Sequence, residues 1–156
     1  MTDVTQILRL ASGDDALFDG MLDLFGTAFE EPETYGAARP GPDYRRRLLS
    51  NPAFIALVAL DGPRVGPRVV GALAGYELPK FESERSEFYI YDLAVAASHR
   101  RRGIATALIR RFGRIAKQRR GWVVFVQADR EDAPAIALYE SLGTREEVIH
   151  FDIAPG

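Results

Sequence analysis

One stretch in the second half of the chain combines a strand, a sharp turn and a helix. Residues 88–96 are rich in aromatic and β-branched side chains, which favour a β-strand. Residues 103–119 repeat apolar side chains at the spacing of one helix face. An arginine-rich turn that ends in Gly103 joins the two. A strand that runs directly into a helix begins a βαβ crossover, so this stretch predicts an α/β fold.

Shorter patterns on both sides of this stretch predict the remaining elements. Before it, we expect an edge strand at 5–10, a helix that follows Asp14 and Asp15 as N-cap candidates and that Pro32 ends, a short helix through Leu49 capped by Asp43, and strands at 54–60 and 69–78 joined by the loop 61–68. Gly71 and Gly75 slightly weaken the prediction for the strand at 69–78. After the stretch, we expect a strand at 122–127, a helix from Pro134 to Leu142 with Gly143 as its C-cap, and a closing strand at 147–153.

The length and composition indicate one globular domain over residues 1–156. The chain has 47% hydrophobic and 27% charged residues, no internal repeat and no long linker. Its apolar runs are too short for a membrane span and its first residues lack a signal sequence, so we expect a cytoplasmic protein that does not bind membranes. It has no cysteine, and its two histidines, His99 and His150, are far apart in sequence, so we expect chemistry without a metal.

Opposite charges are separated along the chain. Residues 93–128 contain nine Lys and Arg and no Asp or Glu. The other 11 of the 20 basic residues share the rest of the chain with all 22 acidic residues, so that remainder carries a formal charge of −11. On charge alone we favour a solvated, arginine-rich helix face. The alternative is an anionic cofactor on one side of the protein and a cationic substrate on the other.

The turn before the helix has the features of an anion site. The first amides of a helix lack intrahelical acceptors and lie at the positive end of the helix dipole, so they favour a phosphate. Gly103 and Ala105 let a phosphate approach the backbone, and the arginines add bidentate donors. No Gly-Lys-Ser or Gly-Lys-Thr and no three-glycine spacing is present, which excludes a P-loop and a dinucleotide fingerprint. The turn therefore predicts a diphosphate bound without magnesium.

Two motifs resemble the signatures of the GNAT superfamily of N-acyltransferases. The sequence Arg100-x-x-Gly103-x-Ala105 after the strand 91–95 resembles its acetyl-CoA signature, and 135–143 is similar to its second signature, including the tyrosine. Asp132 stands where an Asn is common, and Gly143-Thr144 replaces the usual Gly-Phe. The resemblance implies a central mixed, mostly antiparallel sheet flanked by helices, and acetyl-CoA as cofactor. The cofactor-binding residues that it implies are Leu93, Ala94, Val95, Arg100, Arg101, Arg102, Gly103, Ile104, Ala105 and Thr106.

Most of the chain also resembles the aminoglycoside 3-N-acetyltransferases of the gentamicin-resistance type. The segments that carry this resemblance are 79–82, 89–95, 126–129, 145–148 and 150–153. It implies acetylation of the 3-amino group of the 2-deoxystreptamine ring of an aminoglycoside, and thereby antibiotic resistance. A homodimer is expected by analogy. The alternative acceptors are another polyamine or a peptide or protein amine.

An amine that attacks a thioester must be neutral, so the site needs a carboxylate that attracts the ammonium group and accepts its proton. On simple alternation, Asp92 shares a face with Ile90 and Ala94 in a central strand, where an unpaired carboxylate is costly. A buried ion pair or a capping role would also explain this carboxylate. The resemblance implies that Asp92 is the general base.

Tyr139 is the candidate general acid, because a thiol pKa of roughly 8.5 and a tyrosine pKa near 10 are close enough for proton transfer. Its spacing alone favours an aromatic side chain packed in the core, and only the resemblance supports the catalytic role. We expect His99 to be a loop contact and His150 to be structural. The predicted substrate-binding residues form a mainly acidic rim, although each carboxylate by itself fits an ordinary surface position: Glu82, Tyr91, Asp92, Asp129, Asp132, Glu146 and Asp152.

A nucleic-acid-binding module is the alternative from another functional class. The basic residues between 100 and 120 would then form a phosphate footprint. The formal charge of −11 on the remainder of the chain would repel a duplex. We therefore expect no nucleic-acid partner.

Overall fold

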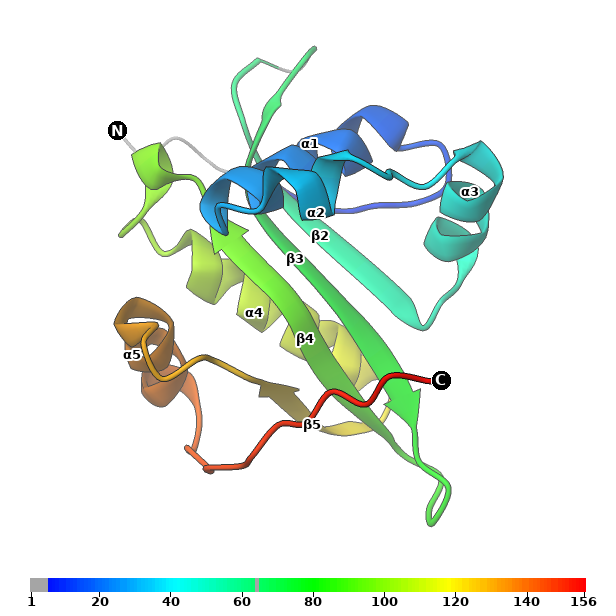
Figure 1. Cartoon of the computed structure of the whole chain (residues 1–156), viewed down its shortest axis with the longest axis vertical. Helices are drawn as coiled ribbons and strands as arrows, with labels where there is room; N and C mark the ends of the chain where they lie inside the picture. Colours follow the sequence, from blue (N-terminus) through cyan, green and yellow to red (C-terminus); the bar gives the residue numbers. More distant parts are fainter. Residues whose placement is uncertain (1–5, 64) are drawn as a thin grey trace.

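The computed structural model describes residues 6–63 and 65–156, which form a five-stranded sheet between helices (Figure 1). The strand order is β1-β2-β3-β4-β5, with β4 and β5 parallel and the other neighbours antiparallel. The strands are β1 (Gln6–Arg9), β2 (Phe54–Asp61), β3 (Arg68–Pro79), β4 (Ser86–Val95) and β5 (Gly121–Val126). The prediction of a mixed, mostly antiparallel sheet is confirmed. Residue 5 of the expected first strand lies outside the described residues.

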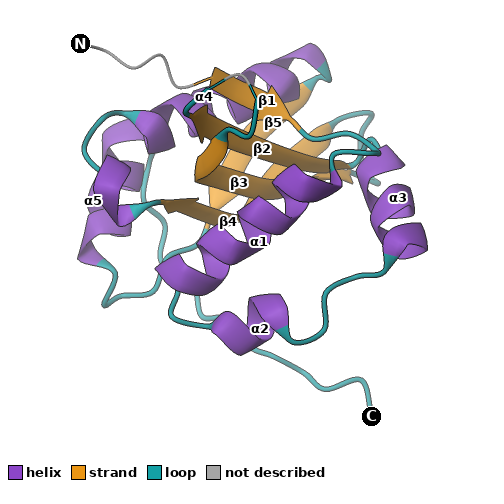
Figure 2. Cartoon of the chain, turned by 90° about the horizontal axis from the view of Figure 1, so that it is seen from above, coloured by secondary structure: helices purple, strands orange, loops and turns teal. Residues whose placement is uncertain are grey.

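Helices cover both faces of the sheet (Figure 2). Helix α1 (Asp15–Ala28) lies on one face, with α2 (Pro32–Gly36) and α3 (Pro42–Ser50) on the same side. Helix α4 (Ile104–Gln118) packs on the other face, and α5 (Ala133–Leu142) lies beside β5 (Figure 1). None of the helices within 6–63 and 65–156 is long and apolar enough to span a membrane.

Two expectations about the first helices are wrong, and one is confirmed. Helix α1 already ends at Ala28, and Pro32 begins α2, because a proline fits the first turn of a helix. Asp43 lies inside the first turn of α3, which begins at Pro42. Asp14 occupies the N-cap position of α1 as expected, although its carboxylate accepts a hydrogen bond from the Ala11 amide at 2.7 Å and none from the first turn of the helix.

Strand β2 is the centre of the core because both of its faces are buried. Phe54, Ala56 and Val58 pack against α1, whereas the alternate residues Ile55 and Leu57 pack against α4. A strand covered on both faces is continuously apolar, as this one is. The sheet is thus fixed from both sides, and β4 is held in register between β3 and β5.

The glycines of β3 are required by the packing of α4. A Cβ atom on Gly75 would lie 2.6 Å from Cζ of Phe112, and one on Gly71 would lie 2.7 Å from Cγ2 of Ile104. These distances are too short for any side chain. The two residues that weakened the prediction for this strand therefore allow the helix to approach the sheet.

The predicted closing strand at 147–153 is absent from the structure. Residues 144–156 have no assigned secondary structure, and all of them are exposed. Regular structure therefore ends with α5, and within the described residues only the β4–α4–β5 unit is parallel. A strand needs a partner, and the single chain offers this segment none within the described residues.

Candidate active site

Strands β4 and β5 separate in the middle of β4. Their pairing ends at Ile90 and Val126, whereas β4 remains paired with β3 as far as Val95. Among the described residues, 91–95 therefore face no neighbouring strand on the β5 side. This free edge includes Leu93, Ala94 and Val95, whose backbone was predicted to bind a cofactor. It can accept an extended ligand that pairs with the backbone as a strand would.

The predicted anion site lies just beyond the end of this free edge. Arg101 and Gly103 have positive φ angles of 61° and 78°, and α4 begins at Ile104. Successive amides in such a turn form a concave nest for anions, and the amides of Ile104, Ala105 and Thr106 lack intrahelical acceptors. A Cβ on Gly103 would have nothing within 4 Å, so the space in front of the turn is open. The residues present fit a diphosphate.

His99 anchors the arginine turn to the sheet. It is buried in the short 3-10 turn η1 (Ala97–His99), where Nε2 lies 2.7 Å from Oδ2 of Asp61 at the end of β2. Its Nδ1 lies 2.7 Å from Oγ of Ser98. The expectation of a loop contact is confirmed, and the arginine turn is held in place by a hydrogen bond to β2.

An irregularity in β4 places Asp92 on the face of the sheet that carries α1 and α2. Gly75 pairs with Ile90 and Ala74 pairs with Asp92, so Tyr91 is an extra residue in the strand. Ile90 packs toward α4, whereas Ala94 packs toward α1. The expectation that Asp92 shares a face with Ile90 is wrong, because the bulge interrupts the alternation. Asp92 shares a face with Ala94 only.

The Asp92 carboxylate lies against α2. Tyr35 of that helix donates a hydrogen bond from its hydroxyl to Oδ2 of Asp92 at 2.8 Å. Burial raises the pKa of the Asp92 carboxyl, the hydrogen bond from Tyr35 opposes this shift, and the negative charge of Glu31 adds to it. Burial, followed by the bond to Asp92, also raises the pKa of Tyr35, so its phenol remains a donor. No cation pairs with Asp92 among the described residues, so this carboxylate is available to a ligand.

Aromatic rings form the wall of this site next to Asp92. Tyr91 lies edge-on to Tyr89 and to Tyr76, with ring centres 5.6 and 6.1 Å apart, and Tyr89 stacks on Phe125 of β5 at 4.7 Å. The hydroxyl of Tyr89 donates to Oε1 of Gln127 at 3.0 Å. Tyr91, a predicted substrate residue, thus belongs to a continuous aromatic face.

Four residues around Asp92 were not predicted as site residues: Glu31, Tyr35, Tyr76 and Tyr89. The acidic run 30–33 with a tyrosine two residues later was a usable signal, and so was the Tyr-x-Tyr spacing at 89–91. Nothing in the sequence indicates that α2 reaches the middle of β4, because that contact depends on the tertiary fold.

Tyr139 and Asp132 lie together on α5. Burial, with a smaller contribution from the charge of Asp132, raises the pKa of Tyr139 to about 12. The phenol therefore stays protonated, but the pKa gap to a thiol of roughly 8.5 is wider than expected from the sequence. Asp132 is the N-cap of α5, where its carboxylate accepts from the Ala135 amide at 3.1 Å. The capping bond satisfies this predicted substrate residue within the protein.

The other predicted carboxylates are dispersed. Glu82 lies in the β3–β4 loop and pairs with Arg85 at 2.9 Å, and the strand between that loop and Asp92 spans roughly 20 Å. Asp129 is exposed in the loop after β5. Glu146 and Asp152 lie in the exposed segment 144–156, where Asp152 interacts with His150 at 2.9 Å. Glu82 therefore lies apart from Asp92, and the other three carboxylates have no hydrogen bond or ion pair with Asp92 or Tyr35 within 6–63 and 65–156.

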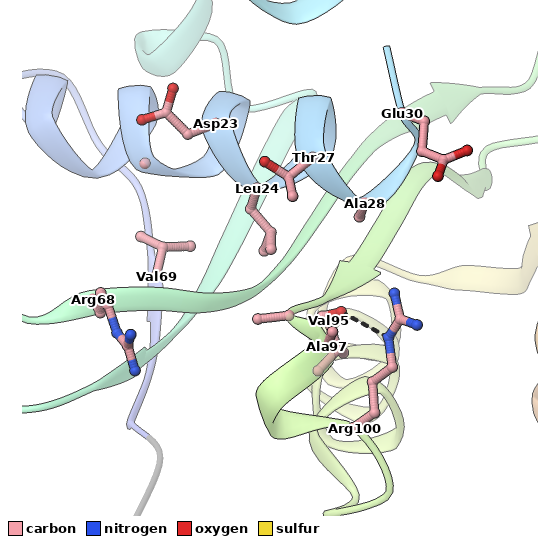
Figure 3. Close-up of a pocket in the computed structure, with 12 residues that line it drawn as sticks. Asp23, Leu24, Thr27, Ala28, Glu30, Arg68, Val69, Val95, Ala97 and Arg100 are labelled. Atoms are coloured by element: carbon pink, nitrogen blue, oxygen red, sulfur yellow. Dashed lines mark hydrogen bonds between the residues drawn. The ribbon is translucent and has the colours of Figure 1, made fainter. Parts of the chain in front are cut away.

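A cavity of about 520 Å³ opens between α1 and the end of β4 (Figure 3). Apolar side chains such as Leu24, Val69 and Val95 line it, together with charged groups from Arg68, Arg100, Asp23 and Glu30. Arg100 donates from Nε to the carbonyl oxygen of Val95 at 3.3 Å. Of the predicted cofactor residues, Val95 and Arg100 line this cavity. The cavity therefore lies at the junction of β4 and the arginine turn.

Comparisons with known proteins agree with this geometry. The sequence profile of the acetyltransferase (GNAT) family matches residues 18–144. An aminoglycoside acetyltransferase from an uncultured soil metagenomic sample has 52% sequence identity and a TM-score of 0.93, with 100% of both chains covered. A second aminoglycoside acetyltransferase, also from an uncultured soil metagenomic sample and in complex with sisomicin, has 32% sequence identity and a TM-score of 0.85. The match covers 97% of this chain and 96% of that one.

A more distant structure extends the range of acceptors among the similar proteins. The ribosomal-protein-alanine N-acetyltransferase from Brucella melitensis biovar Abortus 2308 has 26% identity and a TM-score of 0.72, over 98% of this chain and 100% of that one. A search of curated protein sequences gave no match.

Proposed function

The chain belongs to the acetyltransferase (GNAT) family, and from this premise we propose that it transfers an acetyl group from acetyl-CoA to an aminoglycoside antibiotic. The proposed acceptor is the 3-amino group of the 2-deoxystreptamine ring, and the proposed consequence is resistance to the drug. The observation that carries this proposal is the unpaired Asp92 carboxylate beside the free edge of β4. The two aminoglycoside acetyltransferases among the similar structures support the acceptor class.

Two parts of the chain would hold acetyl-CoA. The open turn around Gly103, with the first amides of α4 and three exposed arginines, would bind the diphosphate. The free edge of β4 at 91–95 would pair with the amide-containing arm. When bound, acetyl-CoA supplies an activated acetyl group in the form of a thioester.

We propose that Asp92 is the general base. An aminoglycoside amine is mostly protonated at neutral pH, and its positive charge is attracted to the half-buried carboxylate and the nearby Glu31. Asp92 accepts the proton that the amine must lose, and the raised pKa of its carboxyl makes it a stronger base than an exposed aspartate. The hydroxyl of Tyr35 holds the carboxylate in position through Oδ2 and leaves Oδ1 for the amine.

The proposed general acid is Tyr139, which returns a proton to the departing thiolate. The phenol is protonated at neutral pH, as a donor must be. Because the pKa of Tyr139 lies above that of a thiol, proton transfer from the phenol to the thiolate is unfavourable before the ligands bind. Tyr139 would therefore first stabilise the thiolate through a hydrogen bond and transfer the proton afterwards.

The shape and charge of the acceptor side suit a polycationic sugar. Tyr76, Tyr89 and Tyr91 offer flat surfaces on which sugar rings can pack, and cations are attracted to aromatic faces. Glu31 is exposed next to Asp92 and would pair with a second ammonium group. Asp129 is free in the loop after β5 for a third contact.

The test is acetyl transfer by the purified protein. Free thiol release is followed with acetyl-CoA and either gentamicin or sisomicin, and the acetylated position is assigned by NMR. We expect release that depends on the drug and a product acetylated at the 3-amino group. Folded protein that binds coenzyme A but releases no thiol above background with either drug would overturn the proposal.

A panel of acceptors distinguishes the alternative. Spermidine and a peptide with an N-terminal alanine are tested at matched concentrations, because one similar structure is a ribosomal-protein-alanine N-acetyltransferase. Turnover of the peptide above that of both drugs would assign the protein to a peptide-acetylating branch of the family. The Asp92→Asn variant is the control for background hydrolysis.

A further inference from the structure

Helix α2 carries Tyr35, the hydrogen-bond donor to Asp92, but the helix itself is too small to be stable alone. It has five residues, and none of them is buried. Forming the first turn of a helix is unfavourable and only further turns offset this, so a one-turn helix needs outside support. The Tyr35 ring packs against Phe25 and Phe29 of α1. Apolar packing is not directional, so it does not by itself fix the hydroxyl at hydrogen-bond distance from Asp92.

Arg39 binds the backbone of α2 to α1 through three different nitrogen atoms. Its Nε donates to the carbonyl oxygen of Tyr35 at 3.0 Å, one of the carbonyls at the end of the helix that lack an intrahelical donor. Its Nη1 donates to Oδ1 of Asp19 at 3.3 Å, and its Nη2 donates to Oδ1 of Asp23. The two aspartates lie four residues apart on one face of α1. A single guanidinium therefore joins the residue that holds Asp92 to the longer helix.

The chain around Arg39 keeps the guanidinium in this position. Pro40 follows it, and a residue before a proline is disfavoured in the helical region, so the backbone of Arg39 is kept out of the helix. Arg45 of α3 binds the same anchor: its Nη2 donates to Oδ1 of Asp19 at 3.1 Å and to the carbonyl oxygen of Pro40 at 3.4 Å. The side chain of Arg39 is 26% exposed, so salt screens its ion pairs less than those of a fully exposed arginine.

The acidic face of α1 depends on these arginines. Asp15, Asp19 and Asp23 follow one another at intervals of four residues, and like charges at this spacing destabilise a helix. Arg39 pairs with Asp19 and Asp23, and Arg45 pairs with Asp15 and Asp19. The three carboxylates therefore become favourable only when the chain beyond α2 folds back onto α1, which is the arrangement that brings Tyr35 to β4.

We propose that Arg39 is a positioning residue for the acetyl transfer, which holds α2 where the hydroxyl of Tyr35 donates to Asp92. The inference rests on the proposed function, in which Asp92 is the general base. Arg39 acts through Tyr35 and not through its own charge, because within the described residues the titratable groups around Asp92 are one carboxyl and four phenols: Glu31, Tyr35, Tyr76, Tyr89 and Tyr91.

The first test measures the Asp92 carboxyl directly and needs no catalysis. The full chain is prepared with isotope-labelled aspartate for NMR, and the Asp92 signal is the one missing from Asp92→Asn. The bond from Tyr35 lowers the pKa of this carboxyl, so its loss in Arg39→Ala should move the titration to higher pH. Arg46→Ala is the matched control, because Arg46 pairs with Asp43 at 2.9 Å on the exposed side of α3, and it should titrate as the wild type does. An unchanged titration in Arg39→Ala would overturn the proposal.

Two milder variants separate position from charge. Asp23→Ala removes a negative charge, which by itself lowers the pKa of a neighbouring carboxyl, but it also removes an acceptor of Arg39. Arg39→Lys keeps the positive charge, but its one nitrogen cannot replace three donors fixed in a planar fork. The pKa of Asp92 should rise in both variants. A lower or unchanged pKa in Asp23→Ala, or a wild-type pKa in Arg39→Lys, would show that Arg39 does not position Tyr35.

A double-mutant cycle on kcat/KM, followed by thiol release, links the position of Tyr35 to the reaction. Arg39→Ala should lower kcat/KM at low pH by up to about tenfold, the factor set by the lower limit for a hydrogen bond to a charged group. In a Tyr35→Phe background the same change should have little further effect, because both variants remove one bond. Losses that multiply would contradict the inference. A shifted Asp92 titration without a matching shift in the pH profile would support Arg39 as the anchor of Tyr35 and overturn Asp92 as the base, so the two failures are distinguishable.

Discussion

Replacing Tyr35 with phenylalanine removes one hydroxyl and leaves the ring. The hydroxyl donates to Oδ2 of Asp92 at 2.8 Å, and this bond lowers the pKa of the carboxyl against the raising effect of burial. The ring stays packed against Phe25 and Phe29, whose ring centres lie 5.7 and 5.9 Å away, so the helix should be retained. The variant Tyr35→Phe therefore isolates the effect of the hydrogen bond on the proposed base.

The magnitude follows from the charge on the acceptor. A hydrogen bond to an ionised group contributes about 1.5–3 kcal/mol, and every 1.4 kcal/mol is a factor of ten. Because Asp92 is only half-buried, water can replace the lost hydroxyl. We therefore use the lower limit of this free-energy range and expect kcat/KM to fall about tenfold. The bond favours the deprotonated carboxylate, so its loss raises the pKa of Asp92 further. The loss in kcat/KM should therefore be largest at low pH and should shrink as pH rises.

The assay is a pH profile of kcat/KM for both proteins, measured by thiol release. The acidic limb of the wild-type protein should lie above that of an ordinary carboxyl, since burial raises the pKa of Asp92. The acidic limb of Tyr35→Phe should lie higher still. Tyr44→Phe on α3 is the matched control, because that exposed side chain does not contact Asp92. Coincident profiles, or a limb displaced to lower pH, would refute the reasoning.

Three further substitutions test the rest of the site and its support. Asp92→Asn should lower turnover by about 10²–10⁴-fold with the affinity for coenzyme A unchanged by calorimetry, and full activity would place the base elsewhere. Gly103→Val puts a β-branched residue at a φ of 78°, which costs about 1–2 kcal/mol. Coenzyme A should therefore bind roughly tenfold more weakly, while turnover at saturation is retained. Wild-type affinity for coenzyme A in this variant would show that the turn does not bind the diphosphate. Gly75→Ala places a methyl group 2.6 Å from Cζ of Phe112, and overpacking of this kind costs about 1–3 kcal/mol, so the Tm should fall by several degrees in calorimetry. An unchanged Tm would mean that α4 can move away from β3 freely.

The elements and their order could be predicted from the sequence because their patterns are local. The continuous apolar run of β2 and the helical spacing in α4 each result from burial that repeats along one element. The arginine turn was also predictable, since its anion-binding amides belong to adjacent residues. These features need no knowledge of distant contacts.

The predictions that failed concern features that depend on residues far apart in the sequence. The bulge at Tyr91 arises from pairing with β3 and leaves no mark in the alternation of β4, so the face of Asp92 was assigned with the wrong neighbour. The contact between Tyr35 and Asp92 joins residues 57 positions apart. The strand expected at 147–153 has the right local pattern but no partner in one copy, and a pattern alone cannot supply a partner.

The extra residue in β4 makes the chemistry depend on how the strand is paired and not only on which residues it contains. If Tyr91 stayed in the strand but the bulge were lost, Tyr91 would pair with Ala74 and Asp92 with Leu73, which would reverse every side chain from Asp92 onward. The carboxylate would then point into the apolar layer under α4, and Tyr91 would take its place opposite Ala74. Deleting Tyr91, by contrast, would leave Asp92 opposite Ala74. A lineage could therefore lose this activity through a substitution that removes the bulge while keeping the helices, the strands and every charged group, so an aspartate at this position does not by itself identify a relative with the same chemistry.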